Sequence, residues 1–205
     1  MNTQTKESQS KLSPIDALNM LKEGNQRFLN KEMSNRDLNS QVAATSGGQY
    51  PFACVLGCID SRVPSELIFD QGIGDIFNVR IAGNFVNTDI LGSMEFACKI
   101  AGSKVILVLG HTSCGAVKGA CDHVELGNLT AMLENFDDAL NASIYEGDRS
   151  SANTEFVNMV TNNNVKLTID KIRNASPLLA EMEANSDISI VGAVYDVSSG
   201  VANFI

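Results

Sequence analysis

Short apolar runs separated by helical stretches are the feature that most constrains the fold of this 205-residue chain. Residues 104–110 read KVILVLG, and similar runs occupy residues 52–57, 76–82 and 188–194. Uninterrupted apolar runs of this length are typical of strands buried on both faces, which need helices over both faces. The alternation therefore predicts an α/β fold with a mainly parallel sheet of four to five strands, in which residues 201–205 could add an edge strand.

The expected helix over residues 13–31 begins with a capping box of Ser13 and Asp16, with a proline between them. Its apolar residues fall roughly on one helical face, and these include Leu18, Leu21 and Phe28. We expect this helix to pack on a neighbouring chain, and residues 1–12 to form a flexible tail of a single domain over residues 1–205. Helical or loop-rich stretches are expected at 89–101, 115–124, 128–145 and 150–173, and a loop at 33–50.

Charge and cysteine usage exclude several classes of partner. The chain has 15 basic and 24 acidic residues, so its formal net charge is −9, which disfavours nucleic acid and anionic membranes. No apolar run approaches the roughly 18 residues that a membrane helix needs, and the polar N-terminus does not resemble a secretory signal. Five cysteines without an export signal favour reduced thiols in the cytoplasm, where they are free to bind a metal.

The residues that carry chemistry come directly after two predicted strands. Cys58, Asp60 and Arg62 follow the first strand, and His111 and Cys114 follow the third. Sites in open α/β sheets form outside the carboxyl ends of strands, so the two segments converge if these strands are neighbours. Two thiolates and an imidazole are ligands that zinc prefers. Three ligands leave a fourth position on the zinc for water. Asp60, oriented by Arg62, is placed to accept a hydrogen bond from this water, or it could itself become the fourth ligand.

Other chemistries fit the sequence less well. Cys58 and Arg62 are too close together for a cysteine phosphatase loop, and Gly72-Ile73-Gly74 lacks the third glycine of a dinucleotide-binding turn. The remaining cysteines lack comparable neighbours and are interpreted as packing residues: Cys54, Cys98 and Cys121.

The sequence resembles a β-class carbonic anhydrase over nearly its whole length. The stretches that carry the resemblance are GCIDSRVPSE (57–66), GDIFNVRIAGN (74–84), GSMEFA (92–97), VLGHTSCGAVKGA (108–120) and VGAVYDVSSGVANF (191–204). The resemblance implies reversible hydration of CO₂ to bicarbonate and a proton by a zinc-bound hydroxide. It makes Cys58, His111 and Cys114 the ligands of one Zn²⁺ per chain, and Asp60 and Arg62 a catalytic dyad beside the metal.

The resemblance also implies a homodimer or a dimer of dimers, with an active site at the interface between chains. Gln49 and Phe77 match pocket residues that the neighbouring chain supplies, and Ala82 and Gly115 add to the pocket. In two places this chain departs from the family pattern. Phe96 stands where a tyrosine is common, and Val55 where bicarbonate-regulated members carry a tryptophan, although Arg80 matches an arginine of that regulatory site.

Two alternatives to CO₂ hydration remain open at this point. The same metal site would suit hydrolysis of carbonyl sulfide or carbon disulfide, a reaction that close relatives in this family catalyse. A closed site with Asp60 as permanent fourth ligand would instead make a structural or binding module, although Arg62 offers Asp60 a competing partner.

Because two thiolates cancel the zinc charge, we expect hydration to increase at mildly alkaline pH. His123 is the one histidine left that could act as a proton shuttle, and the sequence favours interpreting it instead as a solvated residue at a helix end.

Overall fold

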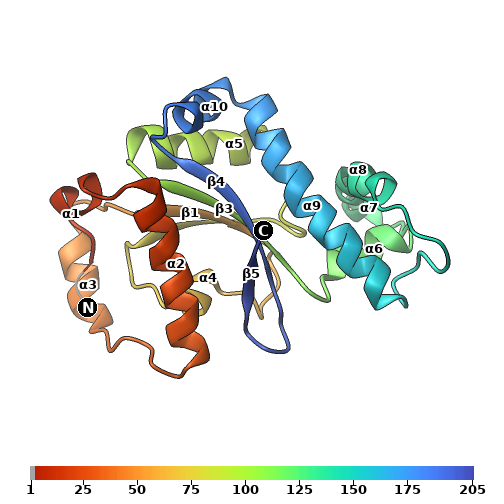
Figure 1. Cartoon of the computed structure of the whole chain (residues 1–205), viewed down its shortest axis with the longest axis horizontal. Coiled ribbons are helices and arrows are strands. Elements are labelled where there is room, and N and C mark those ends of the chain that lie inside the picture. Colours follow the sequence, from red (N-terminus) through yellow and green to blue (C-terminus); the bar gives the residue numbers. More distant parts are fainter. Residues whose placement is uncertain (1–2) are drawn as a thin grey trace.

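The computed structural model describes residues 3–205 and contains a five-stranded sheet covered by helices on both faces (Figure 1). The strands lie in the order β2-β1-β3-β4-β5, and every neighbouring pair is parallel except β4 and β5. Their bounds are β1 Ala53–Gly57, β2 Ile76–Arg80, β3 Val105–His111, β4 Ser189–Tyr195 and β5 Ala202–Phe204. The predicted α/β fold with a mainly parallel sheet is therefore confirmed, including the edge strand near the C-terminus.

Ten α-helices lie in the described part of the chain. Their bounds are α1 Lys6–Ser10, α2 Pro14–Leu29, α3 Leu38–Thr45, α4 Ser65–Ile68, α5 Thr88–Glu95, α6 Gly115–Cys121, α7 Gly127–Leu133, α8 Asp137–Ala142, α9 Thr154–Ala175 and α10 Pro177–Ala184. A π-helical turn extends α5 to Ile100, and a short 3₁₀ turn joins α7 to α8. Figure 1 shows α6, α7 and α8 gathered in a lobe beyond α9, apart from the N-terminal helices.

Two sequence expectations in the N-terminal segment are wrong. Residues 33–50 are not all loop, because α3 forms there with Asp37 as its N-cap, the side chain of which accepts a hydrogen bond from the Ser40 N–H. Part of the expected flexible tail is the helix α1. Its Gln9 side chain is buried and donates to the backbone carbonyls of Pro51 and Ala101, so a polar residue docks this helix. Residues 1–2 of the tail lie outside the described residues.

Alternating side chains of the central strands fill two separate cores. Ile106 and Val108 of β3 pack with α5, α9 and α10 on one face, whereas Leu107 and Leu109 pack with α2 and α4 on the other. The period of two follows from the pleat of the strand. Because helices pack on both faces, every residue of β3 is buried, and its polar residue His111 stands where the strand ends.

Helix α2 packs on the sheet of its own chain. Ala17 and Leu21 are fully buried in the core beside Phe69, so Leu21 is not free to contact a neighbour. Leu18 and Phe28 of the same predicted face are only half-buried. The packing of this helix on a neighbouring chain therefore stays a prediction that rests on its remaining exposed side.

A buried carboxylate connects α2 to the segment that follows the candidate site. Asp70, two residues after the end of α4, is fully buried with a positive φ of 47°. It pairs with Arg27 of α2 at 2.5 Å and with Arg36, and it accepts the Ser34 N–H. Burial alone would raise the pKa of the Asp70 carboxyl, but the hydrogen bonds from Arg36 and Arg27 outweigh burial and lower it.

We expect Asp70→Asn to lower the free energy of unfolding by about 3–5 kcal/mol, because two arginines lose their buried counter-charge. A carboxyl with a lowered folded pKa stabilises the fold above its ordinary pKa, and this contribution is lost as pH falls through the folded pKa. The difference between the two proteins should therefore narrow in acid. Urea unfolding at several pH values measures this. The exposed pair of Asp138 and Lys171 supplies the control, since Asp138→Asn should change stability by less than about 1 kcal/mol. Equal effects of the two substitutions would contradict the role of Asp70.

Candidate metal centre

Strands β1 and β3 are direct neighbours, which was the condition for the two motifs to meet. Gly57 of β1 lies opposite Leu109 of β3, so the residues after both strands emerge at one edge of the sheet. The chain leaves β1 toward β2 on one side and β3 toward β4 on the other. The candidate site therefore lies at the topological switch point, where ligands of open α/β sheets bind.

Three metal-ligating side chains converge at this point. One ligand atom from each of Cys58, His111 and Cys114 lies within 4.8 Å of the others, and all three residues are buried. The two Sγ atoms are 4.0 Å apart. Nδ1 of His111 donates to the Thr112 carbonyl at 2.9 Å, which leaves Nε2 unprotonated in the neutral ring. Among residues 3–205, this buried Nε2 has no hydrogen-bond partner. An unsatisfied imidazole nitrogen beside two sulfurs fits a metal ion such as Zn²⁺.

The two sulfurs lie within hydrogen-bonding distance of each other, and either can be the donor. The hydrogen bond from Cys114 is the largest cause that lowers the pKa of the Cys58 thiol, and the Gly83 N–H adds to it. The same hydrogen bond to Cys58, together with burial, raises the pKa of Cys114. A metal takes both cysteines as thiolates, so binding at this pair would release the proton of whichever sulfur is the donor.

Asp60 is held beside the three ligands by Arg62. The guanidinium donates to both carboxylate oxygens, from Nε to Oδ1 at 3.0 Å and from Nη2 to Oδ2 at 2.7 Å. Oδ2 lies 3.9 Å from Nε2 of His111. These bonds from Arg62 hold the pKa of the Asp60 carboxyl well below its usual range. Asp60 is thus a fixed anion next to the centre. Arg62 occupies the two carboxylate oxygens with which Asp60 would otherwise bind a metal.

Arg80 and Gly83 complete the support of the cysteine loop, and the sequence analysis missed both contacts. Arg80, at the end of β2, donates to the backbone carbonyl of Cys58 at 2.8 Å and to that of Asp60 at 2.6 Å. The Gly83 N–H donates to Sγ of Cys58 at 3.3 Å. The glycine that closes β2 is visible in the sequence, but nothing in the sequence pairs it with Cys58.

The structure separates the four expected pocket residues into two groups. Ala82 adjoins Gly83 beside the centre, and Gly115 follows Cys114 at the start of α6. Gln49 precedes β1 and therefore lies at the opposite end of this strand from Cys58. Phe77 lies on the edge strand β2, opposite Cys54. One chain alone therefore does not bring Gln49 to the centre.

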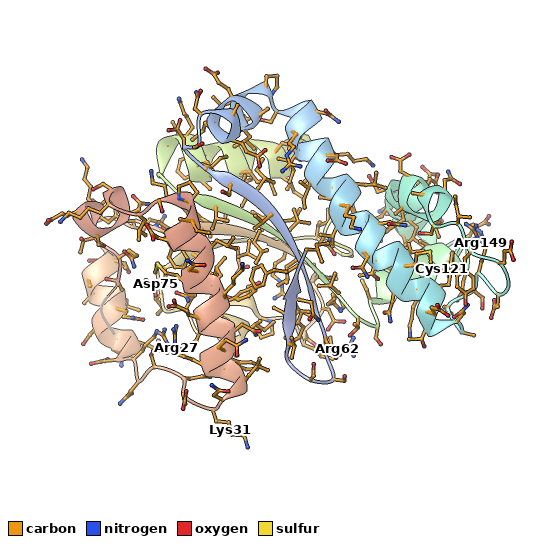
Figure 2. The ribbon with its side chains drawn as sticks, in the orientation of Figure 1. Arg27, Lys31, Arg62, Asp75, Cys121 and Arg149 are labelled. Carbon is orange, nitrogen blue, oxygen red and sulfur yellow. The ribbon has the colours of Figure 1, made fainter. Side chains whose placement is uncertain are left out.

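Phe77 and His123 do not line the candidate metal centre but contact other parts of the molecule. Phe77 stands edge-on to Phe96 with ring centroids 6.2 Å apart. His123 is exposed and lines a pocket together with Cys121 and Arg149. Figure 2 shows Cys121 and Arg149 together in the lobe of α6–α8, well separated from Arg62.

Comparisons with known proteins agree with this fold and site. The carbonic anhydrase family profile matches residues 53–202. The chain is 34% identical to "Carbonic anhydrase 2" of Mycobacterium tuberculosis, over 93% of this chain and 92% of that protein. It is 33% identical to the carbonic anhydrase of Mycolicibacterium smegmatis, over 92% and 91% respectively.

Solved structures show the same likeness. The β-carbonic anhydrase CcaA superposes with a TM-score of 0.69 at 26% identity, covering 92% of this chain and 91% of that one. Tetrameric β-carbonic anhydrases from Sordaria macrospora give a TM-score of 0.68 at 26% identity, covering 82% and 90%. The open α/β sheet with its Cys-His-Cys group thus defines an enzyme class for which CO₂ hydration is the general activity. This chain belongs to the β-carbonic anhydrase family.

None of its helices within residues 3–205 is both long and apolar enough to cross a membrane.

Proposed function

We propose that this chain catalyses the zinc-dependent, reversible hydration of CO₂ to bicarbonate, with Cys58, His111 and Cys114 binding one zinc ion per chain. The observation that carries the proposal is the buried Nε2 of His111, which lacks a partner in the described residues although it lies beside two cysteine sulfurs. Zinc, when bound, supplies a Lewis acid that lowers the pKa of a coordinated water. Because the proposal needs free thiolates rather than a disulfide, we also propose a reducing, cytoplasmic location.

Asp60 and Arg62 form the proposed catalytic dyad. A carboxylate that Arg62 keeps ionised can accept a hydrogen bond but cannot donate one. Asp60 would therefore accept a hydrogen bond from the attacking hydroxyl group, and this bond would orient a lone pair of the hydroxyl oxygen toward CO₂. The same two bonds from Arg62 argue against Asp60 as a permanent fourth ligand.

We expect Asp60→Asn and Arg62→Ala to keep the metal and to lose about 10–100-fold in the rate of CO₂ hydration. The amide of Asp60→Asn can donate a hydrogen bond as well as accept one, so it no longer fixes the orientation of the attacking group. Arg62→Ala removes the two hydrogen bonds that fix the Asp60 carboxylate. Since the pKa of Asp60 is lowered, the carboxylate is charged at all pH values above its ordinary range, so the loss should be the same from pH 6 to 9. Stopped-flow rates and zinc content measure both effects. An unaltered rate would return the dyad to a purely structural role.

We propose that two chains complete the pocket, with Gln49 and Phe77 of each chain serving the centre of the other. Strand β2 is at the edge of the sheet, and a groove beside it is lined by apolar and polar side chains of β2 and α5. Phe96 is 53% exposed and Ile100 is 72% exposed just beyond α5. An open strand edge flanked by exposed apolar side chains favours a homodimer, and two such dimers would form a tetramer.

The substrate is tested by comparing three small molecules on one preparation of the protein. We expect CO₂ hydration to exceed the hydrolysis of carbonyl sulfide and of carbon disulfide by at least an order of magnitude. The reverse ranking would assign the same centre to hydrolysis of the sulfur compounds.

A further inference from the structure

Three consecutive asparagines on α9 have three different partners. The amide of Asn162 donates to the Asn158 carbonyl of its own helix, and the amide of Asn163 donates to Oγ of Ser143. The third, Asn164, is buried and donates to the backbone carbonyl of Gly83 at 2.9 Å, 81 residues away in the sequence. Asn164 thus connects α9 to the segment that supports the metal centre.

Gly83 contacts a sulfur of the centre directly, because its N–H donates to Sγ of Cys58. Its φ of +81° is one that glycine adopts freely, and a Cβ at this position would lie 2.1 Å from Cζ of the buried Phe136. A glycine at such a φ rotates easily unless it is held. Phe136 blocks one side of the glycine, and the hydrogen bond from Asn164 fixes its carbonyl. The Gly83 N–H, which belongs to the preceding peptide unit, donates to the sulfur from the backbone that these two contacts hold.

We propose that Asn164 is a positioning residue for the metal centre, acting through Gly83 to hold the N–H···S hydrogen bond on Cys58. This inference rests on the proposed function, in which Cys58 binds zinc. A hydrogen bond to a thiolate stabilises its lone pairs and orients the ligand, and outer partners of this kind commonly contribute 10–100-fold to metal affinity or activity. Loss of the Asn164 amide should therefore change the sulfur's electronic character as well as its position.

The test replaces zinc by Co²⁺, whose thiolate-to-metal charge-transfer absorption reports the energy of the sulfur lone pairs. Asn164→Leu, close to asparagine in size, should shift this absorption to longer wavelength and weaken zinc binding about tenfold in competition with a chelator. Asn163→Leu, one position away on the same helix, is the matched control and should change neither. Should Asn164→Leu not fold, Asn164→Ser takes its place, because the serine side chain is too short to reach the Gly83 carbonyl.

The outcomes separate the two proposals. A charge-transfer shift and weaker zinc binding in the Asn164 variant alone would support the positioning role. An unshifted absorption with unchanged zinc affinity, even if the variant melts at a lower temperature, would overturn it and leave the metal site standing. Absence of any thiolate-to-cobalt absorption in the unaltered protein would contradict the metal site itself, and this inference with it.

Discussion

Cys114→Ser should purify without zinc and should show no CO₂ hydration above the uncatalysed rate. The serine hydroxyl stays protonated at neutral pH and replaces one of three ligands, so Cys58 and His111 alone would have to hold the metal. Cys58→Ser should have the same effect for the same reason. Metal analysis of the purified proteins and stopped-flow assays measure the two losses.

Cys121→Ser is the control for these variants. Cys121 is buried like Cys114, but it lies on the far end of α6 and lines a different pocket. Its replacement should leave zinc content and the hydration rate unchanged. Full zinc occupancy in Cys58→Ser or Cys114→Ser would contradict the assignment of the ligands.

Phe96→Asp should produce a monomer that has lost at least 100-fold in CO₂ hydration. A charge at this exposed aromatic would have to be buried against the second copy at the proposed β2 interface, and a monomer would lack the partner's Gln49 and Phe77. Sedimentation velocity at low micromolar concentration gives the oligomeric state, and the same samples are assayed for hydration.

Ile144→Asp serves as the matched control for Phe96→Asp. Ile144 is 86% exposed but follows α8, away from β2, so its replacement should change neither mass nor activity. A Phe96→Asp monomer with the full hydration rate would refute the shared pocket. An active dimer of this variant would refute the position of the interface.

The sheet and the grouping of Cys58, His111 and Cys114 were predictable because their signals are local. Apolar runs mark β1, β3 and β4, and the proposed metal ligands stand where the runs of β1 and β3 stop. What the sequence left open was whether β1 and β3 are neighbours, since strand order depends on how the connections cross the sheet. The register of Gly57 with Leu109 resolves this.

The missed features depend on polar residues or on contacts distant in sequence. Helix α1 docks through the buried amide of Gln9, and an apolar pattern cannot reveal such a contact. The link from Asn164 to Gly83 spans 81 residues and exists only once α9 packs across the sheet. Gln49 was singled out by resemblance alone, and its proposed role needs a second chain.

The most direct test of the central claim is the CO₂ hydration rate of one preparation before zinc removal, after dialysis against a chelator, and after zinc is returned. We expect the rate to fall to the uncatalysed value in the metal-free protein and to recover in proportion to added zinc, reaching its plateau at one ion per chain. Undiminished hydration by protein shown to be free of metal would contradict the account.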